Sequence, residues 1–174
     1  MNHPSTDLQG NVISAEVLDQ LLRAELPGQK PADYGLAADT TVDRAIGEAW
    51  STVRAKWKQF QEKRGLITTN GFAETRKHWI KPLFQELGYE LEGAEPELLE
   101  SSERPYPISL RAEGLSGFPV HAVGMCYSLD ERYSNGGRVQ SAHALLQEYL
   151  NHSEHVYGLV TNGLQLRLLR DSTR

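Results

Sequence analysis

Residues 157–171 have the sequence YGLVTNGLQLRLLRD, in which two apolar runs flank Thr-Asn-Gly. Short apolar runs bounded by turn residues are typical of β-strands. Asn-Gly between two such runs predicts a β-hairpin, because a tight primed turn needs positive φ at both central residues. We therefore expect strands at residues 156–160 and 164–169, joined by a tight turn at Asn162 and Gly163.

The residues before this hairpin change between helical and extended patterns. Residues 139–150 and 72–87 carry apolar side chains at helical spacing, and Pro82 is expected to kink or split the second of these helices. Between them, residues 106–112 and the apolar run 118–127 predict strands. The order helix, strands, helix, hairpin predicts an α/β fold, an α+β arrangement with a mixed sheet.

The N-terminal part of the chain is expected to be helical. Residues 1–40 form an extension that contains a short amphipathic helix and a linker with Pro and Gly. Residues 41–65 form a long amphipathic helix, and residues 66–174 form the α/β domain. The apolar side chains of the long helix are spaced by 4, 3, 4 and 3 residues, and they are Ile46, Trp50, Val53, Trp57 and Phe60.

Composition limits the classes of protein to consider. The chain has 174 residues, of which 24% are charged and 39% hydrophobic, as in ordinary globular proteins. The single cysteine, Cys126, excludes an intramolecular disulfide and a Cys-rich zinc site. The sequence contains neither a signal-peptide pattern nor an apolar run of the roughly 20 residues that a membrane span needs. We therefore expect a protein of the reducing cytoplasm with no membrane contact.

Several stretches together resemble a known family. These stretches are residues 74–76, 79–89, 119–123, 147–150 and 157–171. They resemble the nuclease-like N-terminal domain of restriction–modification enzymes, a degenerate variant of the PD-(D/E)xK fold. Such domains also precede adenine DNA methyltransferase domains, including phage-defence methylases of the DISARM kind. The resemblance covers roughly residues 72–171 and implies a restriction-endonuclease-like core.

Comparison with the family motif indicates that this chain lacks the residues with which family nucleases cut DNA. Family nucleases carry an acid after a proline on one strand and Glu-x-Lys at the end of the next strand, and these carboxylates hold Mg²⁺. In this chain Ile108 follows Pro107, and Gly124 and Cys126 stand at the Glu and Lys positions. A glycine cannot bind a metal and a thiol cannot replace an ammonium group. The resemblance therefore implies a domain with no catalytic residue and no metal site.

Acids at other positions provide an alternative. Glu113 and Asp130 lie near the ends of the two predicted strands, and Glu74 matches a helix acid that these domains often carry. If these three carboxylates converged they would hold Mg²⁺, and the chain would be an active magnesium-dependent endonuclease. Three histidines near one another in sequence lack fixed helical spacing and are a weak zinc pattern. They are His143, His152 and His155.

Positive charge is concentrated in two places, although the formal net charge is −5. Lys and Arg side chains neutralise DNA phosphates and release counterions, so we predict contacts with duplex DNA at both places. The expected contacts are Arg54, Lys56, Lys58, Lys63 and Arg64 in the long helix and Arg167 and Arg170 in the last strand, with Arg174 beyond it. Alternatively, the aromatic side of the helix packs on the core and the lysines are its solvated side.

Three functions remain after these observations. The first is a non-catalytic domain that positions DNA or a partner subunit in a restriction–modification or phage-defence DNA methyltransferase. No Asn-Pro-Pro-Tyr-type motif occurs, and the resemblance implies that S-adenosylmethionine binds only in a domain downstream of this chain. The active endonuclease is the second function. The third is a protein–protein interaction module, which the acidic residues 1–40 and 90–103 and the Trp50–Trp57 seam favour.

Overall fold

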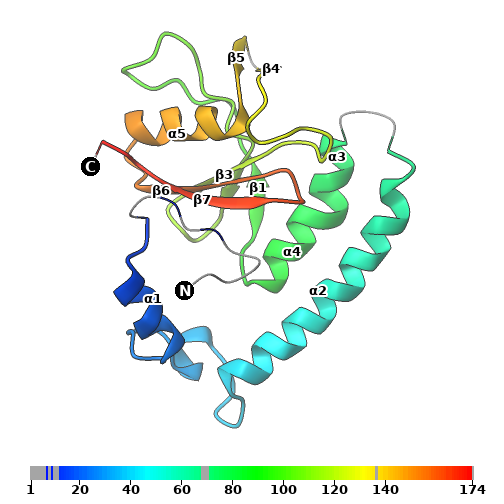
Figure 1. Cartoon of the computed structure of the whole chain (residues 1–174), viewed down its shortest axis with the longest axis vertical. Coiled ribbons are helices and arrows are strands. Elements are labelled where there is room, and N and C mark those ends of the chain that lie inside the picture. Colours follow the sequence, from blue (N-terminus) through cyan, green and yellow to red (C-terminus); the bar gives the residue numbers. More distant parts are fainter. Residues whose placement is uncertain (1–6, 8, 10–11, 68–70, 136, 174) are drawn as a thin grey trace. The chain divides into compact units, whose positions relative to one another are not determined.

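The computed structural model divides the chain into two compact units, Met1–Ser51 and Thr52–Arg174. The residues that it describes are 7, 9, 12–67, 71–135 and 137–173. Arg174, which is expected to contact DNA just beyond the last strand, lies outside the described residues. Figure 1 shows the order of the helices and strands along the chain. None of the described helices is both long enough and apolar enough to cross a membrane.

The first unit contains two short helices and the start of a long one. Helix α1 (Ala15–Leu22) is the short helix expected within residues 1–40. The Ser14 side chain caps it by accepting a hydrogen bond from the backbone N–H of Val17 at 3.3 Å. A 3₁₀ helix, η1 (Pro31–Tyr34), lies within the stretch expected to be a linker.

The long helix α2 (Val42–Arg64) confirms the prediction for residues 41–65. The Thr41 side chain accepts a hydrogen bond from the backbone N–H of Arg44 at 3.2 Å and so caps the helix. Residues 42–51 of α2 belong to the first unit and residues 52–64 to the second. In the second unit the helix buries Val53 and Phe60, as its apolar spacing predicts.

The helix predicted at residues 72–87 is divided into three segments. They are α3 (Phe72–Thr75), a π-helical turn η2 (Arg76–Ile80) and α4 (Lys81–Glu86). Pro82 has no N–H and its ring crowds the preceding turn, so a regular α-helix cannot pass through it without adjustment. The wider π turn, which ends two residues before Pro82, makes this adjustment. Helical residues therefore continue from Phe72 to Glu86, and the regular α-helix is interrupted by a π turn rather than split into separate helices.

The second unit contains a five-stranded mixed sheet in the order β1-β2-β3-β6-β7 (Figure 1). The first three strands are antiparallel, β6 runs parallel to β3, and β7 returns antiparallel to β6. The strands are β1 (Leu91–Gly93), β2 (Leu110–Ala112), β3 (Phe118–Ala122), β6 (Tyr157–Thr161) and β7 (Leu166–Arg170). The predicted mixed α/β architecture is therefore confirmed.

Helices cover both faces of this sheet. Helix α5 (Ala142–His152) covers one face, and α2 with α3 and α4 covers the other (Figure 1). Alternate residues of β3 and β6 face the two sides. The cluster under α5 contains Ile108, Val123, Leu145, Leu146, Tyr149, Leu150, Val160 and Leu169. The opposite cluster contains Val53, Phe60, Trp79, Ile80, Phe84, Leu110, Val120 and Ala122.

Two predicted strands are shorter than expected. Strand β2 includes only the last residues of 106–112, and Tyr106 instead pairs with Glu97 through backbone hydrogen bonds of 2.7 and 3.0 Å. Strand β3 ends at Ala122 and does not continue to residue 127, because the chain turns there and the N–H of Tyr127 bonds to the carbonyl of Gly124. Gly124 and Cys126 are therefore not strand residues.

The helix predicted at residues 139–150 begins later than expected. Ser141 caps α5 by accepting a hydrogen bond from the N–H of Ala144 at 3.1 Å. Val139 belongs to a two-stranded hairpin made of β4 (Tyr133–Asn135) and β5 (Arg138–Gln140). Val139 is exposed and precedes the serine cap, so the helix begins at Ala142 and not at Val139 as the sequence predicts.

The β6–β7 hairpin is confirmed, but its turn differs from the prediction. The loop between the strands comprises residues 162–165, and Asn162 does not have positive φ. Its side-chain oxygen instead accepts hydrogen bonds from the backbone N–H groups of Leu164 and Gln165 at 3.0 and 2.8 Å. Asparagine favours this side-chain turn as readily as a primed turn, and only Gly163 adopts positive φ, at 82°.

Candidate functional site

A cavity of about 350 Å³ lies at the end of β3. Pro107 and Ile108 line it, as does Gly124, so the resemblance places two of its expected catalytic positions at this cavity. Ile108 is buried, with 1% of its surface exposed. The third position, Cys126, does not line this cavity and is exposed. Strand-end cavities with a few polar groups are typical ligand sites.

His121 is the most deeply buried polar side chain of this cavity, with 1% of its surface exposed. Its Nε2 lies 3.1 Å from the hydroxyl oxygen of Tyr133, whereas Nδ1 has no partner among the described residues. Burial lowers the pKa of His121 to about 4 and raises the pKa of Tyr133 to about 12. Both groups are therefore neutral near pH 7, and one ring nitrogen of His121 lacks a hydrogen-bond partner.

The pKa of His121 predicts how stability changes with pH. In the unfolded chain the imidazole takes up a proton near its ordinary pKa of 6.5, but in the folded protein only near 4. Acid therefore favours unfolding in this range, and between pH 7 and 5 we expect His121 to reduce the free energy of unfolding by about 2 kcal/mol. His121→Gln should remove this part of the loss, as measured by urea unfolding at both pH values. An unchanged pH dependence would contradict the assignment.

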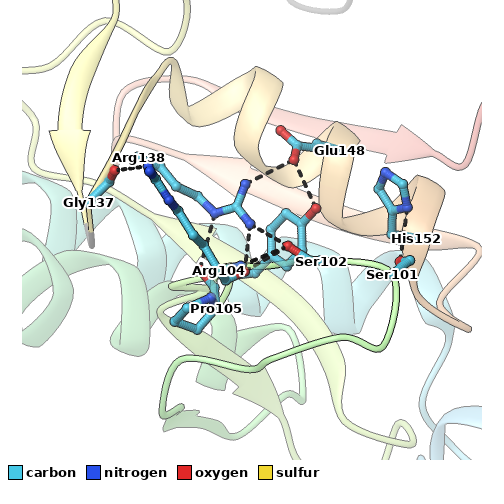
Figure 2. A network of polar contacts seen from close by, with 9 residues as sticks. Ser101, Ser102, Arg104, Pro105, Gly137, Arg138, Glu148 and His152 are labelled. Carbon is cyan, nitrogen blue, oxygen red and sulfur yellow. Dashed lines mark hydrogen bonds and ion pairs between the residues drawn. The ribbon is translucent and has the colours of Figure 1, made fainter.

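The β4–β5 hairpin, which lines the cavity with Tyr133, Ser134 and Asn135, is attached to the domain through Arg138 (Figure 2). The Arg138 guanidinium group donates hydrogen bonds to Glu148 on α5 and to the carbonyl oxygens of Arg104 and Pro105. It also donates to the Ser102 hydroxyl at 2.8 Å and lies 4.0 Å from the centroid of the Tyr106 ring.

This attachment fixes the position of one wall of the cavity. Arg138 is almost enclosed, with 12% of its side chain exposed, and its partner Glu148 also accepts a hydrogen bond from Tyr106 at 2.9 Å. Charge-assisted hydrogen bonds of this kind are stronger than neutral ones. Arg138 therefore ties β5 to a loop and to α5, in addition to the contacts of Tyr133 with His121 and of the Gly137 carbonyl with Arg104.

The basic residues of α2 differ in how they are paired. Lys56 forms an ion pair with Glu86 of α4, with 2.6 Å between Nζ and Oε1. Four other cations are exposed and have no carboxylate partner among the described residues. They are Arg54, Lys58, Lys63 and Arg64. Of the five expected contacts in this helix, four are available to a ligand and one is already paired.

The end of α2 lies beside the turn that follows β3. Arg64 lines a second cavity together with Gln61, Met125 and Cys126. Because Gly124, in the same turn, lines the strand-end cavity, the two cavities share one segment of the chain. The structure therefore brings the basic end of α2 close to the positions where the resemblance expects nuclease residues.

The arginines of the last strand are largely engaged within the domain. Both terminal nitrogens of Arg167 donate to the carboxylate of Asp130, at 2.6 and 2.7 Å. This pairing raises the pKa of Arg167 and lowers that of Asp130. Arg170 is half-buried on β7, and its Nε is enclosed. The arginines of β7 therefore offer fewer unpaired positive charges to a ligand than α2 does.

The three carboxylates of the alternative metal site lie on separate segments. Glu74 is exposed on α3, Glu113 is exposed in the turn after β2, and Asp130 is paired with Arg167. Within the described part of the chain, no group of three or more His, Cys, Asp or Glu side chains is placed to hold a metal ion. His152 is near Ser101, with 3.1 Å between Nδ1 and the hydroxyl oxygen.

Sequence analysis alone did not identify the polar residues that line or support the cavity. These residues are Arg76, His121, Tyr133 and Arg138. One signal was available, because His121 interrupts an otherwise apolar strand and a buried histidine needs a polar partner. The other three come from segments whose contacts with β3 or α5 arise only in the folded chain.

Comparisons with protein-family models, with curated proteins and with solved structures gave no match for this chain. The features of this chain that bear on function are therefore the cavity, the exposed cations of α2 and the order of the sheet.

Proposed function

We propose that this chain is a nuclease-fold domain without catalytic carboxylates that binds duplex DNA through α2. In this role it positions DNA or a partner subunit for a restriction–modification or phage-defence methyltransferase, whose S-adenosylmethionine site is in another domain. One observation carries the proposal: four exposed cations without carboxylate partners among the described residues lie along α2, which ends beside the turn after β3. Cations left unpaired in this way are available to neutralise phosphates.

The topology of the second unit supports the fold assignment. A helix is followed by three antiparallel strands, the β4–β5 hairpin, a second helix and the β6–β7 hairpin, whose first strand is parallel to β3. The restriction-endonuclease-like core that the resemblance implies is expected to have the order helix, strands, helix, hairpin, and this arrangement supports it. Ile108 and Gly124, which replace an acid and a Glu in the expected motif, line a cavity at the end of β3, where a nuclease centre is expected.

The helical positions of the cations favour binding in a groove. Successive residues of an α-helix are about 100° apart, so Arg54 and Lys58 lie within about 40° of each other and Lys63 about 180° from Arg54. The buried side of the helix carries Val53 and Phe60. Arg54 and Lys58 therefore lie on one flank of its exposed side and Lys63 on the other. Arg64 lies about 20° from Val53 and is exposed only because it is at the end of the helix. A helix of about 10–12 Å diameter fits the roughly 12 Å major groove, where each flank faces the phosphates of one strand.

A variant with one cation removed from each flank tests this proposal. Lys58→Gln/Lys63→Gln is expected to weaken binding to a labelled duplex by roughly 10- to 30-fold near physiological salt, because two phosphate contacts are lost. Fluorescence anisotropy measures the affinity. The control, Arg23→Gln/Lys30→Gln, removes the same charge from exposed residues of the first unit and should change it less than about 2-fold. Equal losses in both variants would show that only total charge matters, which would refute the proposal.

A protein–protein interaction module is the second candidate function. Ile46 and Trp50, one turn apart on α2, are 60% and 62% exposed, and exposed aromatic residues are common at the centres of interfaces. This candidate becomes the better one if the chain shows no salt-dependent affinity for DNA.

A further inference from the structure

The charges around the strand-end cavity favour an anionic ligand. Arg76 is the one charged side chain among the described residues that line it, and no carboxylate lines it. The guanidinium carbon of Arg76 lies 5.2 Å from the centroid of the Phe72 ring. An arginine held on an aromatic face keeps its donors available to an oxyanion such as phosphate.

The walls of the same cavity favour a ligand with a flat apolar part. Phe72, Tyr127 and Tyr133 all line it, and the two tyrosine ring centroids are 5.0 Å apart. Aromatic faces stack with nucleobases of any sequence. A volume of about 350 Å³ is within the range of roughly 300–1,000 Å³ that small-molecule sites occupy.

The cavity also contains a polar group that a ligand would satisfy. Nδ1 of His121 is buried and has no partner among the described residues, while Nε2 is bonded to Tyr133. A buried ring nitrogen without a partner is unfavourable, because the hydrogen bond it made to water in the unfolded chain is not replaced. The edge of a nucleobase carries both donors and acceptors, so it can pair with Nδ1 in either tautomer.

We infer that this cavity is a nucleotide-binding site in which Arg76 binds the phosphate, the aromatic side chains hold the base, and His121 contacts the base edge. The nucleotide is either a free mononucleotide or one nucleotide of a DNA strand. Only the second source depends on the proposed DNA-binding function. The site differs from a nuclease centre because it recognises a base and a phosphate without cutting a bond.

Calorimetric titration of the full chain with the four deoxynucleoside 5′-monophosphates tests the first source. At least one monophosphate is expected to bind about 10-fold or more tightly than its nucleoside and than inorganic phosphate, since base and phosphate are both recognised. Arg76→Gln should weaken this binding about 10-fold. Its neighbour Lys77 is exposed and does not line the cavity, so Lys77→Gln should change the affinity less than about 2-fold.

Titration with a short single-stranded oligonucleotide tests the second source. If the mononucleotides do not bind, Arg76→Gln must still weaken oligonucleotide binding about 10-fold more than Lys77→Gln does. Equal effects of the two variants on every ligand would overturn the inference, as would inorganic phosphate binding as tightly as the nucleotides. Lys58→Gln/Lys63→Gln should leave mononucleotide binding unchanged, so failure of this inference is distinguishable from failure of duplex binding by α2.

Discussion

Replacing Gly163 with alanine is expected to lower the free energy of unfolding by about 2–5 kcal/mol. Gly163 has a φ of 82°, which costs energy for any residue with a Cβ atom. A Cβ at this position would lie 2.6 Å from Cγ2 of Thr75 and 3.1 Å from Cδ1 of Trp79. The Gly163 carbonyl also accepts a hydrogen bond from the Trp79 ring N–H at 2.6 Å, so any shift of the loop disturbs the helix beneath it.

Gly114 provides a matched control for this substitution. Its φ is 75°, but no atom lies within 4 Å of a Cβ placed there. Gly114→Ala therefore carries the backbone cost without the collision, and we expect a loss of about 1 kcal/mol. Urea unfolding followed by tryptophan fluorescence measures both variants. Equal losses would show that the β6–β7 loop is not packed on the helix in the way described.

Replacing Arg138 with methionine is expected to cost about 2–4 kcal/mol of stability. Methionine fills similar space but cannot donate, so it leaves the carbonyl oxygens of Arg104 and Pro105 without this partner and ends the ion pair with Glu148. The β4–β5 hairpin should also open more often than in the unsubstituted protein. Its amide protons should therefore gain more in exchange rate from the substitution than those of β6. Urea unfolding and hydrogen exchange measure the two effects.

Arg104 is the corresponding control, since it is exposed and its side chain donates one described hydrogen bond, to the Gly137 carbonyl at 2.9 Å. Arg104→Met should cost less than about 1 kcal/mol, as is usual for exposed polar contacts. If Arg138→Met were no more destabilising than Arg104→Met, the proposed anchoring of the hairpin by Arg138 would be wrong.

The parts of the fold that sequence predicted well have a clear period or a strong cap. Helix α2 has apolar residues at regular helical spacing and a threonine cap, and the β6–β7 hairpin has two apolar runs around Asn-Gly. Strands β4 and β5 have three residues each, too short for alternation to be visible. They depend on Arg138, whose partners lie more than 30 residues away at Ser102 and Arg104.

The sequence predicts where the candidate site lies, but not which polar residues form it. Pro107, Ile108 and Gly124 marked the end of β3 through their alignment with a nuclease motif, and the structure has a cavity there. The residues that make the cavity polar, Arg76 and the pair His121–Tyr133, come together only through packing of a helix, a strand and a hairpin. A local pattern contains no information about such contacts.

The most direct test of the central claim is a salt titration of duplex binding by the full chain. Fluorescence anisotropy with a labelled duplex of about 20 base pairs, between about 50 and 200 mM salt, gives the slope of log K against log[salt]. If the four free cations of α2 contact phosphates, a slope of about −3 to −4 is expected. Absence of binding at the lowest salt, or a slope near zero, would contradict the account.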